Sequence, residues 1–190
     1  VALQPNLYDA RYDLGFVLAK LGKPEEARQQ LEKALQINPS SSEARFQLST
    51  VLRSLGQKEQ ANQELKVFQQ KKAETVKQDV AGVKVNQANQ FLSTGEVQKA
   101  LDLYRDALTD DPNNGRTQYD YALALDRAGD LSAERDALVK SVTLDATFAP
   151  AHNQLGLLDL QAGQMAEAEQ HLKLAISLDP QYAEAQSNLG

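Results

Sequence analysis

Residues 8–41 read YDARYDLGFVLAKLGKPEEARQQLEKALQINPSS, and this stretch decides the fold of the chain. On both sides of Gly22 its apolar residues recur every three to four positions, a spacing typical of amphipathic helices. Similar stretches follow along the chain, each closed by a glycine. These glycines recur about every 34 residues, with one longer step in the middle: Gly22, Gly56, Gly95, Gly129 and Gly163. The pattern indicates one small unit that is copied several times.

A unit of this size cannot bury its own apolar face, so neighbouring units must stack into an elongated solenoid. Prolines mark the same period, since Pro5 and Pro39 stand at the same place in successive units. The step from Pro39 to Pro112 is five residues longer than two periods. The step from Gly56 to Gly95 is likewise five residues longer than one period. Both series of markers therefore predict a single insertion in the middle of the chain.

This register also predicts how the chain is organised. We expect the tail of a preceding repeat at residues 1–7 and two repeats with an extended last helix at residues 8–75. A junction follows at residues 76–80, then three repeats at 81–182 and the start of a further repeat at 183–190. Because the chain begins without Met and ends inside a unit, we expect it to be a segment of a longer protein. No polar capping element protects either end, so we expect a homodimer or end-to-end self-association through the uncapped ends.

The first unit resembles the tetratricopeptide repeat (TPR) family, whose repeat pattern places Leu-Gly, large residues, Gly, Ala and Pro at set positions. Those positions hold Leu14, Gly15, Leu18, Gly22, Ala27, Leu31, Ala34 and Pro39. The last unit, residues 149–182, matches nearly as well. The resemblance implies an all-α fold, a right-handed α-solenoid of stacked antiparallel helix pairs that forms a TPR-like superhelix.

In the first unit, the turn and the contact between the two helices explain why the repeat needs these residue types. Gly22 can adopt the positive φ that ends a helix and lets the next helix return antiparallel. Small residues at Gly15, Ala27 and Ala34 allow the two helix backbones to approach closely. The buried positions around them are expected to hold leucines: Leu14, Leu18 and Leu31. The fourth unit departs from this pattern, because larger polar residues replace the small ones: Glu134 and Ser141.

The junction between the second and third units is less regular. Phe68 stands where Ala is usual and Ala73 where Pro would end the helix, so the second helix of the second unit should run on. Asp79 is a candidate N-cap, and Gly82 costs about 1 kcal/mol inside a helix. We therefore expect an interruption within residues 69–92, with one long helix as the alternative.

Composition limits the chemistry available to the chain. It has 190 residues, no Cys, two His and a net charge of −6, with a pI near 5.0. Without Cys there are no disulfides, thiolate nucleophiles or Cys-based zinc sites. The acidic balance and the lack of a basic stripe argue against nucleic acid as a partner. No apolar run is long enough for membrane insertion. The sequence does not fix the compartment.

Catalysis is not expected, because no motif brings a nucleophile, base or metal-ligand set together. His152 and His171 lie on different helices of the last unit and lack a metal-ligand spacing, so a structural role is the better interpretation. The pair Asp110–Asp111 stands just before Pro112, where acidic residues commonly end such units. We therefore expect a protein that is not an enzyme and binds no metal and no cofactor.

The resemblance implies a binding surface instead, since the first helix of each repeat lines the concave groove of a TPR superhelix. We expect groove residues that bind a peptide or protein segment at Tyr12, Phe16, Lys20, Phe46, Thr50, Arg53, Asn89, Arg116, Tyr119, Asp126 and Asn153. The alternative for the aromatic members is packing between adjacent helices. Chaperone-binding TPR domains carry a clamp of Lys and Asn for carboxylates, and this chain has other residues at those places, so a chaperone tail is not the expected ligand.

The sequence therefore predicts a non-catalytic protein–protein interaction or scaffold module. Two alternatives stay open: a self-association module, and a regulatory TPR array attached to a catalytic domain outside this segment. The loose, Gln-rich style of the repeats favours a bacterial source.

Overall fold

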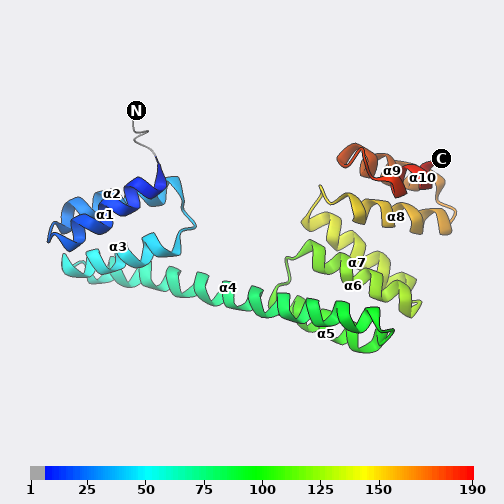
Figure 1. Ribbon diagram of the computed structural model, residues 1–190, viewed down its shortest axis with the longest axis horizontal. Helices are drawn as coiled ribbons and strands as arrows, with labels where there is room; N and C mark the ends of the chain where they lie inside the picture. Colours follow the sequence, from blue (N-terminus) through cyan, green and yellow to red (C-terminus); the bar gives the residue numbers. More distant parts are fainter. Residues whose placement is uncertain (1–6) are drawn as a thin grey trace. The chain divides into compact units, whose positions relative to one another are not determined.

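The computed structural model describes residues 7–190, and these residues form ten α-helices and no strand (Figure 1). The helices are α1 Tyr8–Lys20, α2 Pro24–Ile37, α3 Ser42–Ser54, α4 Lys58–Ser93, α5 Val97–Asp110, α6 Gly115–Ala128, α7 Leu131–Leu144, α8 Ala149–Gln161, α9 Met165–Leu178 and α10 Ala183–Leu189. The predicted all-α fold of stacked helix pairs is confirmed. The expected tail of a preceding repeat falls almost entirely on residues 1–6, outside the described part of the chain.

The chain divides into two compact units, Val1–Val76 and Lys77–Gly190, and the boundary falls within α4. Unit 1 contains α1, α2, α3 and the first part of α4. Unit 2 contains the rest of α4 and the helices from α5 to α10.

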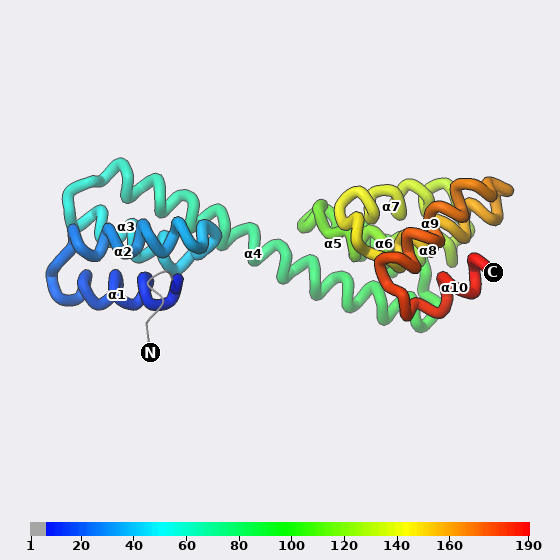
Figure 2. The backbone as a smooth tube through the Cα atoms, turned by 90° about the horizontal axis from the view of Figure 1, so that it is seen from above, coloured from blue at the N-terminus to red at the C-terminus, as the bar shows by residue number. Residues whose placement is uncertain are grey.

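In unit 1, α1 and α2 lie side by side and α3 packs on α2 (Figure 2). The turn between α1 and α2 depends on Gly22, which has a φ of +72°, a conformation that costs other residues more. Gly15 allows close approach, because a Cβ atom added there would lie 2.8 Å from Cγ of Leu31. Ala27 and Leu31 are both fully buried at this contact. The expected roles of the small residues in the first unit are therefore confirmed.

The expected burial of Leu14 is wrong, since its side chain is 45% exposed. The residue at the same place in the fifth repeat, Leu155, is only 2% exposed. That residue lies on α8, which follows and contacts α7, whereas α1 has no helix pair before it in the described chain. Burial at this place in the repeat therefore depends on the preceding repeat.

In unit 2 the helix pairs α6–α7 and α8–α9 pack together, and α10 lies against α9 and α8. The main core of this unit runs from Ala88 on α4 to Leu158 on α8, with Tyr104 fully buried inside it. Gly156 repeats the close approach of the first unit, since a Cβ there would lie 2.7 Å from Cγ of Leu172. One packing solution therefore serves the first and fifth repeats.

The fourth repeat accommodates its two polar residues by hydrogen bonding. The buried hydroxyl of Ser141 donates to the carbonyl oxygen of Gly115 at 2.7 Å. Glu134 is also fully buried, and its Oε1 accepts from Nε2 of Gln154 at 3.3 Å. Its Oε2 has no hydrogen-bond partner in the described structure. Both polar replacements thus have a hydrogen-bond partner, but one buried oxygen stays unsatisfied.

The expected interruption within residues 69–92 is wrong, because α4 runs unbroken for 36 residues. Gly82 stays helical and does not take the positive φ of the turn glycines. A helical glycine costs about 1 kcal/mol, whereas a break would also expose backbone N–H and C=O groups at two new helix ends. The repeat pattern has a proline at position 73, but this chain has Ala73 there, so no proline stops the helix.

Candidate functional site

In unit 1 the expected site residues lie on α1 and α3, the first helices of the two repeats. We call their side chains the unit 1 first-helix face: Tyr12, Phe16, Lys20, Phe46, Thr50 and Arg53. The two phenylalanines are unusually exposed for aromatic residues, at 37% for Phe16 and 44% for Phe46. The ammonium of Lys20 lies 5.4 Å from the ring centroid of Phe16, within cation–π range. The face thus combines uncovered aromatic surface with a nearby cation.

Other members of this face are partly engaged in packing. Phe46 contacts Phe68 of α4 with 5.2 Å between ring centroids, so it is both a packing residue and an exposed one. Tyr12 is half-buried, and burial raises the pKa of its phenol. The hydroxyl of Thr50 donates to the carbonyl oxygen of Phe46 at 3.1 Å. The structure therefore supports both interpretations of these aromatic residues, partial packing and exposure.

In unit 2 two expected residues of α6 meet one residue that the sequence analysis did not select. Tyr119 packs edge-on against Phe148 with 5.2 Å between centroids. The guanidinium of Arg116 lies 5.4 Å from the centroid of the same ring. Phe148 precedes α8 directly, outside the first-helix places, which is why the repeat pattern did not select it.

The remaining expected residues of unit 2 differ in exposure. Asn89 is exposed and accepts a short hydrogen bond from the hydroxyl of Tyr104. Asp126 is exposed near the end of α6. Asn153 is only 2% exposed, and its Oδ1 accepts from Nδ2 of Asn188 at 2.9 Å. The side chain of Asn153 therefore joins α8 to α10 rather than facing solvent.

Asp120 was also missed by the sequence analysis. It is half-buried on α6, and burial raises the pKa of its carboxyl group. Within residues 7–190 it makes neither a hydrogen bond nor an ion pair.

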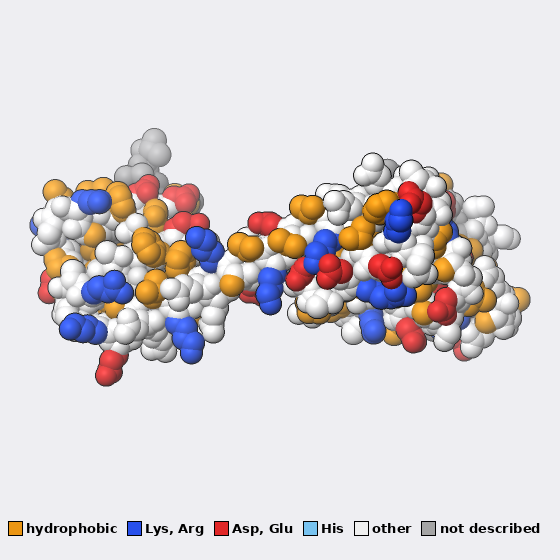
Figure 3. Space-filling view, turned by 90° about the horizontal axis from the view of Figure 1, so that it is seen from below, with side chains coloured by type: hydrophobic (Ala, Val, Ile, Leu, Met, Phe, Trp, Pro, Cys, Tyr) orange, Lys and Arg blue, Asp and Glu red, His pale blue; other side chains and the backbone are white. Residues whose placement is uncertain are grey.

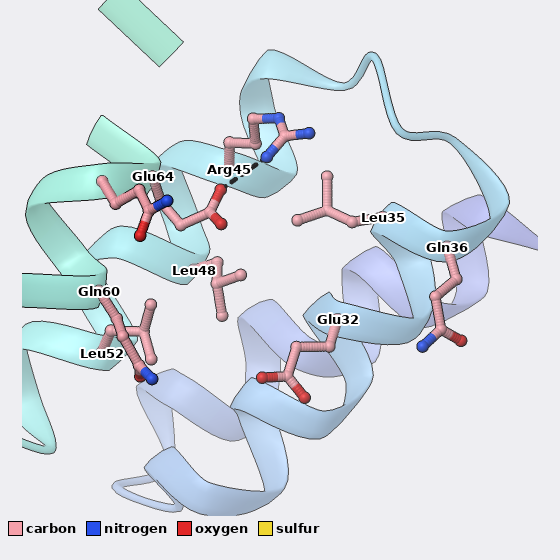
Figure 4. A pocket seen from close by; sticks show the side chains of 9 residues that line it. Glu32, Leu35, Gln36, Arg45, Leu48, Leu52, Gln60 and Glu64 are labelled. Carbon is pink, nitrogen blue, oxygen red and sulfur yellow. Dashed lines mark hydrogen bonds and ion pairs between the residues drawn. The ribbon is translucent and has the colours of Figure 1, made fainter. Parts of the chain in front are cut away.

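Unit 1 also contains a cavity of about 430 Å³ between α2, α3 and α4 (Figure 4). Leu35, Leu48 and Leu52 give it an apolar part. Arg45 and Glu64 point toward each other across one side and form an ion pair of 2.7 Å between Nη1 and Oε2. Because the charges of Arg45 and Glu64 are paired with each other, neither side chain is free to act as a catalytic group in this cavity.

The two histidines lie together between α8 and α9 of unit 2. Their Nδ1 atoms are 3.3 Å apart, and Nε2 of His152 lies 3.2 Å from the carbonyl oxygen of Ala146. Burial lowers the pKa of His152. Within residues 7–190 no three or more His, Cys, Asp or Glu residues are grouped so that they could hold a metal ion. The histidines are therefore placed as packing partners of one helix pair.

Surface charge is mixed on the visible face of each unit, where acidic and basic side chains are interspersed with apolar ones (Figure 3). Across the described helices, none is long and apolar enough to cross a membrane.

Family models described as "Tetratricopeptide repeat" match three stretches of the chain, residues 18–75, 85–147 and 149–182. A comparison with curated proteins gives no match. These models cover most of the repeats identified from the glycine and proline spacing.

Solved structures with the same fold share little sequence with the chain. The first TPR of Spaghetti (RPAP3) bound to the HSP90 peptide SRMEEVD has 21% identity and a TM-score of 0.57, with 59% of this chain and 89% of that chain covered. MamA 41-end from Desulfovibrio magneticus RS-1 has 19% identity and a TM-score of 0.50, with 92% and 96% covered. The APC/C hetero-tetramer Cut9-Hcn1 has 15% identity and a TM-score of 0.53, with 98% and 42% covered.

Proposed function

Because the chain belongs to the tetratricopeptide repeat family, we propose that it is a non-catalytic protein-interaction module that binds a peptide or protein segment on its first helices. Repeat solenoids bury their core between neighbouring units and present long surfaces to partners. One neighbour of the same fold was solved with a bound peptide, which supports this kind of function for the chain.

One observation carries the proposal: Phe16 and Phe46 remain 37% and 44% exposed although the core of unit 1 is complete around Leu31 and Leu48. Aromatic side chains contribute strongly to binding when a partner removes them from water. Lys20 and Arg53 border the same face and can orient polar groups of a ligand. Apolar anchors with charged neighbours are typical of peptide-binding surfaces.

The test uses a library of random 12-residue peptides displayed on phage and selected on the immobilised full chain. Affinities of recovered peptides are measured by fluorescence anisotropy for the wild type and for Phe16→Ala with Phe46→Ala. We expect at least tenfold weaker binding in this double variant, since the loss of two interface anchors together typically exceeds the free energy of a tenfold change in affinity.

Ile37→Ala is the matched control, because Ile37 is 43% exposed on α2, a second helix. This variant should bind as the wild type does. If no peptide is recovered, or if the control weakens binding as much as the double variant, the proposal is wrong.

Self-association is a second candidate function, favoured by one observation on α4. Val80 and Val83 lie three positions apart on one face of this helix, and their side chains are 44% and 59% exposed. A second copy of the chain could cover this apolar patch. Sedimentation velocity over a hundredfold concentration range tests the idea. Val80→Glu should abolish any dimer, and a monomer at every wild-type concentration would contradict it.

A further inference from the structure

One side of α1 carries a continuous apolar stripe. Leu14 and Val17 lie on it three positions apart, and their side chains are 45% and 50% exposed. Leu7 and Leu21 continue the stripe at its two ends, each two helical turns from Leu14. Within residues 7–190 the main neighbours of α1 are α2 and α3, and both leave these side chains exposed (Figure 2). We call these four residues the α1 stripe.

The same places in the second and fifth repeats are buried. Leu48 and Val51 of α3 belong to a core that they share with α2. Leu155 and Leu158 of α8 belong to a core that they share with α7. In both cases the second helix of the preceding repeat packs on the first helix of the next. This side of a first helix is therefore an interface between helices in those two repeats.

The third repeat shows what stands at these places when no second helix packs there. Its first helix is the later part of α4, which continues directly from the second helix of the second repeat. Exposed glutamines take the places of the two central stripe residues, at Gln87 and Gln90. The earlier turns of the same face stay apolar around Val80 and Val83. The repeat pattern thus accepts polar residues at the centre of this face, and a continuous apolar stripe on α1 marks an interaction surface.

Charged side chains follow one edge of the α1 stripe. Asp9 and Asp13 lie in the first half of α1 and Lys20 lies at its end. Their spacing of four and then seven residues places all three on one side of the helix. Within residues 7–190 none of the three forms an ion pair. The edge is therefore negative at one end and positive at the other.

This arrangement is complementary to itself when two α1 helices lie antiparallel. A two-fold axis near Leu14 places this side chain against Leu14 of a second copy. The same axis places Leu7 opposite Leu21 of the second copy. Lys20 then lies beside Asp9 of the second copy, on the charged edge of the stripe. In a parallel alignment, equal charges would face each other instead.

We infer that the α1 stripe is a self-association surface, on which two copies of the chain pair through antiparallel α1 helices. The second copy takes the place that α2 takes on α3 and that α7 takes on α8. Phe16 is two residues from Leu14 and so lies on the other side of α1. Peptide binding on the unit 1 first-helix face and pairing through the α1 stripe are therefore separate properties.

Sedimentation velocity of the full chain tests the pairing, over the concentration range used for the α4 patch. Leu14→Glu places two carboxylates at the two-fold axis, so the dimer should dissociate about tenfold more readily or more. The core of unit 1 should persist, because Leu14 is already exposed. Leu174→Glu is the matched control, since Leu174 is 40% exposed on α9, and this variant should pair as the wild type does. Far-UV circular dichroism checks the helical content of both variants.

Charge reversal tests the antiparallel direction. Lys20→Asp places two acidic groups at each end of the paired helices, and Asp9→Lys places two basic groups there. Each variant alone should therefore pair more weakly than the wild type. An equimolar mixture of the two should pair as tightly as the wild type, because opposite charges then meet at both ends. In a parallel pair, neither variant alone would weaken the dimer.

A wild-type chain that stays monomeric at every concentration would overturn this inference. Equal dissociation constants for the wild type and Leu14→Glu, or no recovery in the mixture, would overturn it as well. A dimer that Val80→Glu abolishes and Leu14→Glu leaves intact would assign self-association to the α4 patch instead. The peptide affinities of the Phe16 and Phe46 variants test the proposed function independently of all these results.

Discussion

At the scale of single residues, the smallest side chains of the repeat decide whether its helices can pack. Gly156 lies so close to Leu172 that a methyl group has no room, and Leu172 is itself 1% exposed and cannot move aside freely. Gly156→Ala should therefore lower the free energy of unfolding by about 1–3 kcal/mol, as overpacking does. Urea unfolding followed by circular dichroism measures this change. An unchanged midpoint would show that the helix pair relaxes without cost.

Glu134 tests the cost of a buried carboxylate at a place where the repeat usually has Ala. Burial raises its pKa, so its ionised form is less stable in the folded chain than in the unfolded one. The penalty is absent below the ordinary pKa of Glu and grows as the pH rises through the raised value. Glu134→Gln should therefore be more stable than the wild type at neutral pH and equally stable in acid. Urea midpoints from about pH 4 to about pH 8 test this, and a gain that is independent of pH would contradict it.

The histidine pair predicts the opposite dependence on pH. Burial lowers the pKa of His152, with the nearby His171 adding to the effect, so the folded chain resists protonation there. Asp159 of α8 and Arg135 of α7 are ion-paired at 2.7 Å close to His171. Stability should be complete above the ordinary His pKa of 6.5 and should fall as the pH drops below it.

NMR titration is direct for this prediction, since the chain has only two histidines. In His171→Gln the pKa of His152 should rise, because one source of positive charge is removed. A wild-type pKa of His152 at or above its ordinary value would contradict the account.

At the scale of helices, Gly82 is a glycine inside the long helix α4. Nothing lies within 4 Å of the place that its Cβ would occupy. Gly82→Ala should therefore raise the free energy of unfolding by about 0.5–1 kcal/mol, since alanine favours helix and meets no clash. The same urea experiment checks this value, with Gly156→Ala as the contrasting substitution. A loss of stability would indicate that residues near Gly82 leave the helix in solution.

The helices also show how far sequence could lead. The contact of Gly15 with Leu31 and the turn at Gly22 were predictable, because each depends on residues within one repeat. The exposure of Leu14 was not, since it depends on whether another repeat precedes it. The continuity of α4 was not predictable either. It depends on whether a glycine inside the helix costs less free energy than two new helix ends, and the sequence alone does not show which cost is larger.

The same reasoning explains the candidate site. The family pattern placed Phe16 and Phe46 on first helices, and the structure shows them on α1 and α3 with exposed side chains. Asp120 was missed because its partial burial depends on how the helices of unit 2 pack, which the repeat pattern does not give. Asn153 was expected on the surface, but Asn188 of α10 covers it through a hydrogen bond. Contacts between repeats, which sequence spacing does not reveal, account for both differences.

At the scale of the whole molecule, the central claim is that partners bind along the first helices of the repeats. Amide hydrogen exchange of the full chain, with and without a saturating display-selected peptide, tests this claim most directly. For a peptide that binds the unit 1 first-helix face, the account predicts added protection in α1 and α3 and little change in the second helices α2, α5, α7 and α9. Protection confined to the second helices, or no change anywhere on binding, would contradict it.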